Sequence, residues 1–155
     1  AGLEWKPLED LVLMAEYHFN GFGAESAREY ASKLRSGRVS RGEVFGAGRH
    51  YLGLGAVWSA TELLSLQATV IANLADPSAI VVPSLEYWAE QSVLVRLGGY
   101  VPIGKGPDPR GLEALSTADV LTGSPAYVDA TSTLGLRSEY GASPWGLFVQ
   151  VGVYF

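Results

Sequence analysis

Hydrophobic and polar residues alternate along several stretches of this chain. In the stretch 61–74, the even-numbered positions from 64 onward are all hydrophobic, whereas the odd-numbered positions include Ser65, Gln67, Thr69 and Asn73. Successive side chains of a β-strand point to opposite faces, so this stretch is predicted to form a strand with one hydrophobic and one polar face. A helix would distribute the same residues over all of its sides.

Five further stretches alternate in the same way, at 11–20, 51–58, 81–87, 93–101 and 145–155. The sequence therefore predicts about six strands of about ten residues each, which is the length of a tilted strand that crosses a membrane. The segment 126–136 also alternates and would add a seventh strand. We interpret it as strand-like structure in or above an outer loop.

The predicted connections are of two kinds. Short turns are expected at 59–62, 75–78 and 89–92, the second of which contains Asp and Pro. Long connections are expected at about 22–46 and 105–141, the first with a short helix from Glu25 to Arg35. The chain contains no internal repeat, and we treat 1–155 as a single region.

Composition narrows the class of protein. Of the 155 residues, 48% are hydrophobic and 17% are charged, and an ordinary soluble domain has about 25% charged residues. This hydrophobic content excludes a disordered chain, and no uncharged apolar stretch reaches the length of about 18 residues that a transmembrane helix needs. The net charge of −5 argues against a nucleic-acid partner, and the absence of cysteine excludes disulfides and thiolate metal sites.

The content of the two strand faces favours a membrane β-barrel over a soluble sandwich. The outward face of a sandwich would carry Lys, Glu and Asp, whereas the polar face here holds mostly small uncharged residues, and the other face is almost uncharged in mid-strand. A porin-like barrel combines a lipid-facing apolar surface with a polar lumen, and its closure pairs every backbone group. The predicted lumen-lining residues are Glu16, His18, Asn20, Gln67, Thr69, Asn73, Glu86 and Arg96.

The last ten residues, GLFVQVGVYF, resemble the C-terminal strand of Gram-negative outer-membrane β-barrel proteins. That family ends on an aromatic residue, usually Phe, which follows hydrophobic residues at alternate positions. The matching positions are Leu147, Val149, Val151, Val153 and Phe155. The resemblance implies that they form the signal read by the barrel assembly machinery, and that the protein lies in the cell outer membrane with its last residue in the periplasm.

This orientation predicts on which side of the membrane each connection and each aromatic residue lies. The two long connections lie outside the cell, and the turns at 59–62 and 89–92 lie in the periplasm. Trp58 and Tyr87 lie near the periplasmic interface and Trp145 near the outer one, as an aromatic girdle in contact with membrane lipids. The first long loop is expected to be solvated or to bind lipopolysaccharide phosphates through its basic residues. These are Arg28, Lys33, Arg35, Arg38 and Arg41.

Six strands do not close a barrel, because bacterial single-chain barrels start at about eight. Three sources for the remaining strands stay open, namely a longer parent chain, copies of this chain and a partner protein. A start at 1–5, just before the first strand, fits a partial chain best, and the amino end lacks the pattern of a signal peptide.

Candidate catalytic residues are few. His18 shares a face with Glu16 and Asn20, and His50 begins a strand; we interpret both as polar residues near a barrel rim. No catalytic or dinucleotide-binding motif is present, so neither enzymatic activity nor a cofactor nor a metal is expected. Glu86 and Arg96 are expected to form a cross-strand ion pair, which would tune ion selectivity in a pore or fill a small barrel.

The sequence thus predicts an all-β protein, an antiparallel transmembrane β-barrel or the C-terminal part of one. Its expected function is that of a passive pore or transport barrel, or of a barrel that anchors a partner complex. The alternative is a soluble, secreted β-barrel that binds a small ligand. A third interpretation, an outer-membrane hydrolase, would need His18 or His50 in a catalytic triad.

Overall fold

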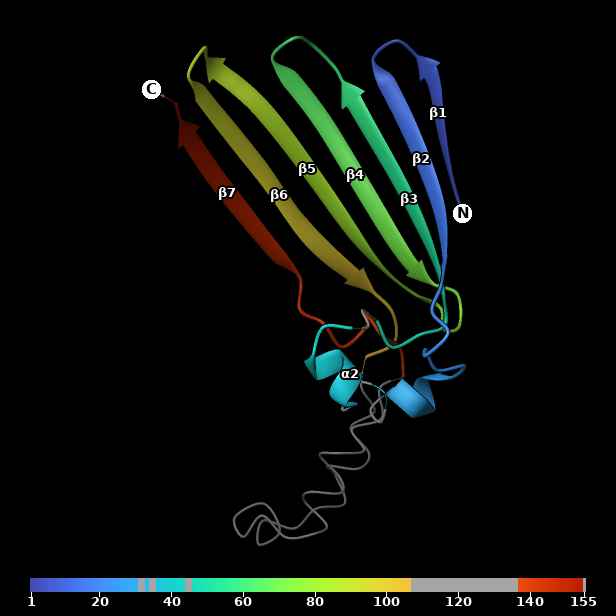
Figure 1. Cartoon of the computed structure of the whole chain (residues 1–155). Helices are drawn as coiled ribbons and strands as arrows, with labels where there is room; N and C mark the ends of the chain where they lie inside the picture. Colours follow the sequence, from blue (N-terminus) through green and yellow to red (C-terminus); the bar gives the residue numbers. More distant parts are fainter. Residues whose placement is uncertain (31–32, 34–35, 44–45, 107–136, 155) are drawn as a thin grey trace, which may run out of the picture.

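A computed structural model describes residues 1–30, 33, 36–43, 46–106 and 137–154. Seven strands form one antiparallel sheet in chain order (Figure 1). The strands are β1 (Gly2–Leu8), β2 (Leu11–Phe19), β3 (His50–Ser59), β4 (Leu64–Asn73), β5 (Ser78–Glu90), β6 (Val93–Ile103) and β7 (Gly146–Val153). Within this sheet β1 pairs only with β2, and β7 pairs only with β6. The described strands therefore form an open antiparallel sheet and not a closed barrel, as expected for a chain with fewer than about eight strands.

Six of the strands, β2 to β7, lie where the alternation predicts them. The placement of the amino end before the first strand is wrong, because 2–8 form β1 and pair with β2 from Gly2 opposite Glu16 onward. A bulge between Trp5 and Leu8 interrupts the pairing at Lys6 and Pro7. In the sequence, Leu3 and Trp5 alternate with Glu4 and Lys6 over only four residues before Pro7 and Leu8 end the pattern, so the strand is hard to recognise. The proposed strand-like segment at 126–136 lies outside the described residues.

The two ends of the sheet differ in their connections. At one end, which we call the turn end, short links join β1 to β2, β3 to β4 and β5 to β6. At the other end, the loop end, a short turn joins β4 to β5, and long connections of residues 20–49 and 104–145 join β2 to β3 and β6 to β7. The first long connection contains the 3₁₀-helix η1 (Ala27–Glu29), inside the predicted helix 25–35, and α2 (Gly37–Ser40). No helix in the described part of the chain is long and apolar enough to span a membrane.

The register sorts the strand residues into two faces. The polar face holds the even-numbered residues of β1, β2, β5, β6 and β7 and the odd-numbered residues of β3 and β4; the apolar face holds the others. At the bulges 6–7 on β1 and 89–90 on β5 the register shifts, so beyond them this assignment of odd and even residues to the two faces no longer holds. Apart from the bulges, the described strands carry no Asp, Glu, Lys or Arg on the apolar face.

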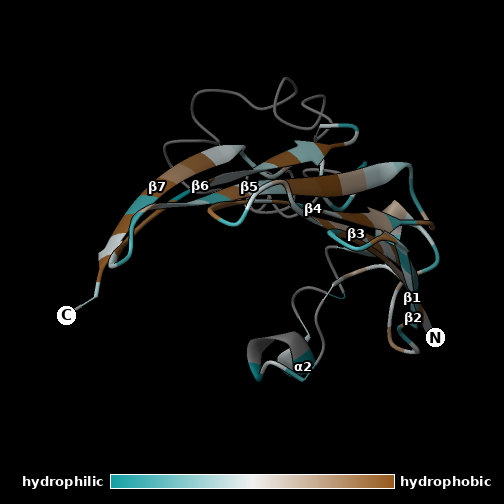
Figure 2. Cartoon of the chain, turned by 90° about the horizontal axis from the view of Figure 1, so that it is seen from above, coloured by the Kyte–Doolittle hydropathy of each residue, from teal (hydrophilic) through white to brown (hydrophobic). Residues whose placement is uncertain are grey.

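The sheet is curved, and the polar face is the concave one. Viewed along the strands, the sheet forms an arch with α2 on its concave side (Figure 2). Residues of the connection that carries α2, including Phe22 and Glu43, line a cavity together with Glu16 and Tyr51 of the polar face. The apolar face therefore forms the convex outside of the arch.

The main buried cluster lies at the loop end and not in the sheet. Among the described residues, the buried hydrophobic side chains are Ala24, Tyr30, Ala47, Tyr51 and Leu94. The first three belong to the long connection between β2 and β3 and pack together there, with Ala27 against them. The convex face remains open, with Leu54 in mid-strand 46% exposed and Val149 on β7 69% exposed.

Candidate functional site

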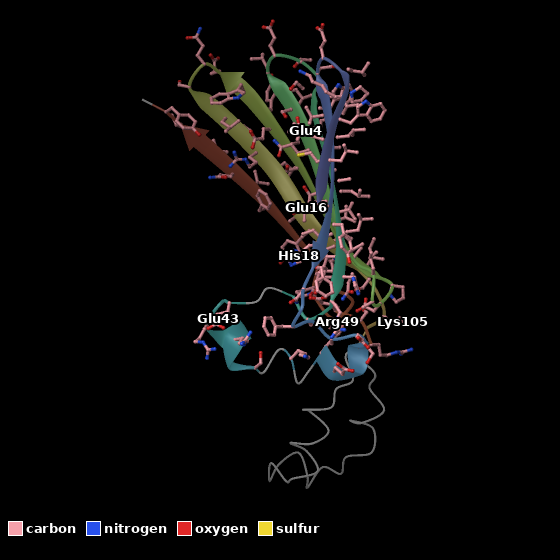
Figure 3. The ribbon with its side chains drawn as sticks, turned by 45° about the vertical axis from the view of Figure 1, so that its right-hand side comes forward. Glu4, Glu16, His18, Glu43, Arg49 and Lys105 are labelled. Carbon is pink, nitrogen blue, oxygen red and sulfur yellow. The ribbon has the colours of Figure 1, made fainter. Side chains whose placement is uncertain are left out.

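The polar face brings together the residues predicted to line a lumen. Glu16, His18, Gln67, Thr69, Asn73, Glu86 and Arg96 lie on this face of β2, β4, β5 and β6, and Asn20 follows β2 directly. Figure 3 shows Glu4, Glu16 and His18 following one another along the sheet toward the loop end. Asn20 and Asn73 differ from the others because they are buried and bond to the connections instead of lining open space. The lumen itself remains a prediction.

An ion pair crosses the polar face near the turn end. The register sets Glu86 opposite Arg96, and Arg96 Nε donates to Glu86 Oε1 over 2.6 Å. Arg96 Nη1 also donates to Gln150 Oε1 over 3.0 Å, which extends the contact to β7. The expected cross-strand pair is confirmed, and it neutralises both charges while it links β5, β6 and β7.

A cavity of about 810 Å³ lies on the polar face at the loop end. Gly53 and Gly55 form part of its floor. They lie opposite Glu16 and Met14 in the register, and because they have no side chains they leave this space open. The size lies within the range of about 300–1,000 Å³ that small-molecule sites occupy. Tyr51 contributes another part of the lining.

The charges around this cavity are mostly acidic. Glu16 has no ion-pair or hydrogen-bond partner among the described residues, and none of the described lining residues is Lys or Arg. Glu43 accepts a bond from Arg41 Nε at 2.6 Å, and the Arg38 guanidinium lies 3.9 Å from the centre of the Phe22 ring. The two arginines that contact these lining residues, Arg38 and Arg41, therefore already have partners.

Two of the predicted lipopolysaccharide-binding residues, Arg38 and Arg41, thus engage in contacts within their own loop. The side chains of Arg28 and Arg35 lie outside the described part of the structure. Another arginine of this connection, Arg49, donates through Nη1 to Glu25 Oε1. Binding of lipopolysaccharide remains a prediction.

Buried polar side chains tie the three loop-end connections together. We call Tyr30, Tyr51, Asn73, Asp76 and Glu139 the loop-end network. The Tyr30 hydroxyl donates to Asp76 Oδ2 over 2.5 Å, and the Tyr51 hydroxyl donates to Glu139 Oε2 over 2.7 Å. Asn73 Nδ2 joins the two halves, with bonds to the Tyr30 hydroxyl at 2.8 Å and to Glu139 Oε2 at 2.6 Å.

Backbone groups complete the network. The Ala47 amide donates to Glu139 Oε1 over 2.8 Å, and the Glu139 amide donates to Asp76 Oδ2 over 3.1 Å. Burial is the main cause that raises the pKa of the Tyr30 phenol, and its bond to Asp76 raises this pKa further. Burial, together with the charges of Glu139 and Asp76, raises the pKa of Tyr140 to about 12. Both phenols therefore stay protonated to a higher pH than an exposed tyrosine does.

Sequence reasoning missed this network, because its members come from positions as far apart as 30 and 139. Two buried atoms beside it, Asp76 Oδ1 and Ser78 Oγ, have no hydrogen-bond partner in the described structure. No three His, Asp or Glu side chains among the described residues are grouped so that they could hold a metal ion.

The two histidines contact aromatic side chains. The ring of His18 lies 6.3 Å from that of Tyr51, and His50 Nδ1 shares a hydrogen bond of 2.6 Å with the Tyr17 hydroxyl. In the described structure neither histidine bonds to a serine or a carboxylate. No catalytic triad is therefore assembled from these residues as described.

Aromatic residues lie at both ends of the apolar face. Trp58 and Tyr87 lie near the turn end, and Trp145 precedes β7 at the loop end. Tyr17 and Phe19 also lie at the loop end, where both pack on His50. The alternation itself could have identified this pair, because both residues occupy the hydrophobic parity of β2.

The residues predicted as an assembly signal end the sheet. Leu147, Val149, Val151 and Val153 lie on the apolar face of β7, and each is more than half exposed. Phe155 lies outside the described residues. Comparison of the chain with protein-family models, with curated proteins and with solved structures finds no match.

Proposed function

We propose that these seven strands belong to a β-barrel in the outer membrane of a Gram-negative bacterium, with the apolar face against lipid and the polar face around a lumen. The observation that carries the proposal is the convex face, which is uncharged on all seven described strands apart from the bulges. A water-exposed sheet face normally carries charged residues, whereas a lipid-facing one excludes them.

The lengths of the central strands support this proposal. β3 and β4 each contain 10 residues. At about 3.4 Å per residue and a tilt of about 45°, such a strand spans about 24 Å along the membrane normal, close to the apolar band of about 25 Å in outer-membrane barrels. The aromatic residues Trp58, Tyr87 and Trp145 lie near the two limits of that span, as interfacial residues do.

The curvature argues against the soluble alternative. A soluble barrel that binds a small ligand packs its apolar face inward and exposes its polar face to water. Here the polar face is concave and the apolar face convex, with Val149 69% exposed. The arrangement is the inverse of the one that the soluble alternative needs.

The proposed activity is passive passage of solutes along the polar face. Glu4 and Glu16 lie on this face without a described partner, whereas the charges of Glu86 and Arg96 cancel. Unpaired carboxylates that line a pore favour cations over anions. We therefore propose a pore with a preference for cations.

Two measurements test the proposal on the protein extracted from its native membranes. The protein should sediment with outer membranes and stay monodisperse only in detergent, and it should raise the ion conductance of a planar lipid bilayer. A protein that is monodisperse in plain buffer would support the soluble alternative. A detergent-dependent protein without conductance would contradict the pore and leave an anchoring barrel as the function.

A further inference from the structure

Both outer edges of the described sheet lack a neighbouring strand. β1 pairs only with β2 and β7 only with β6. The Tyr154 amide donates to Ser92 O over 2.9 Å, just beyond β7. Because backbone groups alternate along an antiparallel strand, those of the odd-numbered residues 147–153 point away from β6. In lipid, where no water can bond to them, such groups need a partner.

The two edges differ in how they are protected. Soluble proteins shield free edges with charged residues, proline or bulges. β1 has all three, with Glu4 and Lys6, Pro7 and the bulge between Trp5 and Leu8. β7 has the sequence GLFVQVGV and contains neither a charged residue nor a proline. Its side chains on the apolar face are exposed, with Leu147 at 72% and Val149 at 69%. The edge of β7 is thus suited to pair with another strand.

Strand direction limits what this strand can be. All six pairings in the sheet are antiparallel, so the seventh strand runs in the same direction as the first. Direct pairing of β7 with β1 would therefore be parallel. Bacterial single-chain outer-membrane barrels have even numbers of antiparallel strands. Antiparallel closure needs an odd number of additional strands between β7 and β1.

A second copy of the seven strands does not meet this requirement. Two copies inserted with their loop ends on the same side of the membrane present edges that all run in one direction. Any pairing of β1 or β7 with either edge of that copy would then be parallel. An inverted copy would pair correctly, but it would place the long connections on opposite sides of the membrane.

We infer that the free edge of β7 pairs with a further β-strand that runs antiparallel to it, from the turn end to the loop end, and that this strand does not come from a second copy of the seven strands. An odd number of such strands joins β7 to β1. The inference rests on the proposed function and deepens it. The partner is an amphipathic segment whose uncharged apolar residues continue the face of Leu147, Val149 and Val151.

Photo-crosslinking in native membranes tests this inference. A benzophenone amino acid replaces Leu147 in one variant and Val153 in another, at the two ends of β7, and mass spectrometry identifies the crosslinked peptides. Both adducts should fall in one segment with alternating hydrophobic residues, about six positions apart. The partner of residue 153 should precede the partner of residue 147 in that segment, because the strands are antiparallel.

Three results would overturn the inference: adducts in the opposite order, adducts to residues 2–8 or 146–153 of another copy, or adducts to lipid alone at both positions. A second variant covers the case of a probe that disturbs pairing. The chain has no cysteine, so Val151→Cys introduces a unique thiol. Mild oxidation should give no disulfide-linked homodimer, and a homodimer would show that β7 edges of two copies meet.

A control at Leu54 separates failure of this inference from failure of the proposed function. Leu54 lies in the middle of the apolar face on β3 and is 46% exposed. A benzophenone at this position should form adducts with lipid and none with a further strand. Absence of lipid adducts at Leu54 would contradict the membrane proposal, whereas the adducts at 147 and 153 decide the edge pairing.

Discussion

A lysine in the middle of the convex face is the sharpest test of the membrane proposal. Leu54 pairs with Val70, which in turn pairs with Val81, so the residue lies in a row of apolar side chains across the sheet. Leu54→Lys would place a charge in this row. The matched control is Thr69→Lys, because Thr69 lies opposite Gly55, one position along β3, but on the polar face.

The size of the effect follows from the position of Leu54 along its strand. It is the fifth residue of β3, which runs from His50 to Ser59. In the proposed membrane, at about 2.4 Å of depth per residue, Leu54 would lie about 10–12 Å from either end of the strand and hence near the midplane. Lysine on the lipid face at that depth costs about 2–4 kcal/mol of folding free energy. Thr69→Lys lies on the polar face and should cost less than about 0.5 kcal/mol, as for an ordinary surface substitution.

Urea titration of the protein in lipid vesicles measures both variants, with the transition followed by tryptophan fluorescence. We expect the midpoint to fall for Leu54→Lys and to stay near that of the unsubstituted protein for Thr69→Lys. In a soluble sheet, Leu54 would be a half-exposed surface residue, and both lysines would be tolerated. Equal free energies of unfolding for the two variants would therefore refute the assignment of the convex face to lipid.

Three other predictions concern the polar face and the loop end. Glu16→Gln should reduce the cation-to-anion permeability ratio, because it removes an unpaired carboxylate from the polar face. Reversal potentials in a KCl gradient measure this ratio, and an unchanged ratio would show that Glu16 does not lie on the conduction path. Asn73→Ala should destabilise the loop end by about 1–3 kcal/mol, since it removes the donor shared by Tyr30 and Glu139; limited proteolysis should then cleave the long connections faster. Because the pKa of Tyr140 is raised to about 12, stability that depends on its neutral phenol is present below pH 10 and is lost as the pH rises toward 12. Absorbance at 295 nm should show this late step, and Tyr140→Phe should reduce its amplitude without removing it, since the pKa of Tyr30 is raised as well.

Alternation along the chain predicted most of the sheet because strand faces are a local property. β2 to β7 follow from the spacing of hydrophobic residues, and the antiparallel register then keeps Glu16, Gln67 and Arg96 on one face. β1 was missed because its alternation covers only the four residues from Leu3 to Lys6, before Pro7 and the bulge end it.

The loop end could not be predicted in the same way. Asn73 was assigned to the lumen, yet its amide bonds to Tyr30 and Glu139, which lie 43 and 66 positions away. Such contacts depend on how the connections fold over the sheet end, and no periodicity in the sequence reports them. Glu139 itself lies in a short polar segment with no distinguishing pattern. Chemistry that is assembled from distant loops therefore needs the structure.

The exposed convex face and the free edge of β7 share one explanation in the proposed barrel. The described sheet buries little of its own apolar surface, since Tyr51 and Leu94 are the buried hydrophobic residues on its strands. Burial of apolar surface contributes about 25 cal/mol per Å², so a sheet that leaves this face in water forgoes its main source of stability. A second layer from the described loops does not cover the face, because α2 lies on the concave side. Lipid would cover the convex face and further strands would pair with the edges, so the same closed barrel would satisfy the side chains and the backbone together.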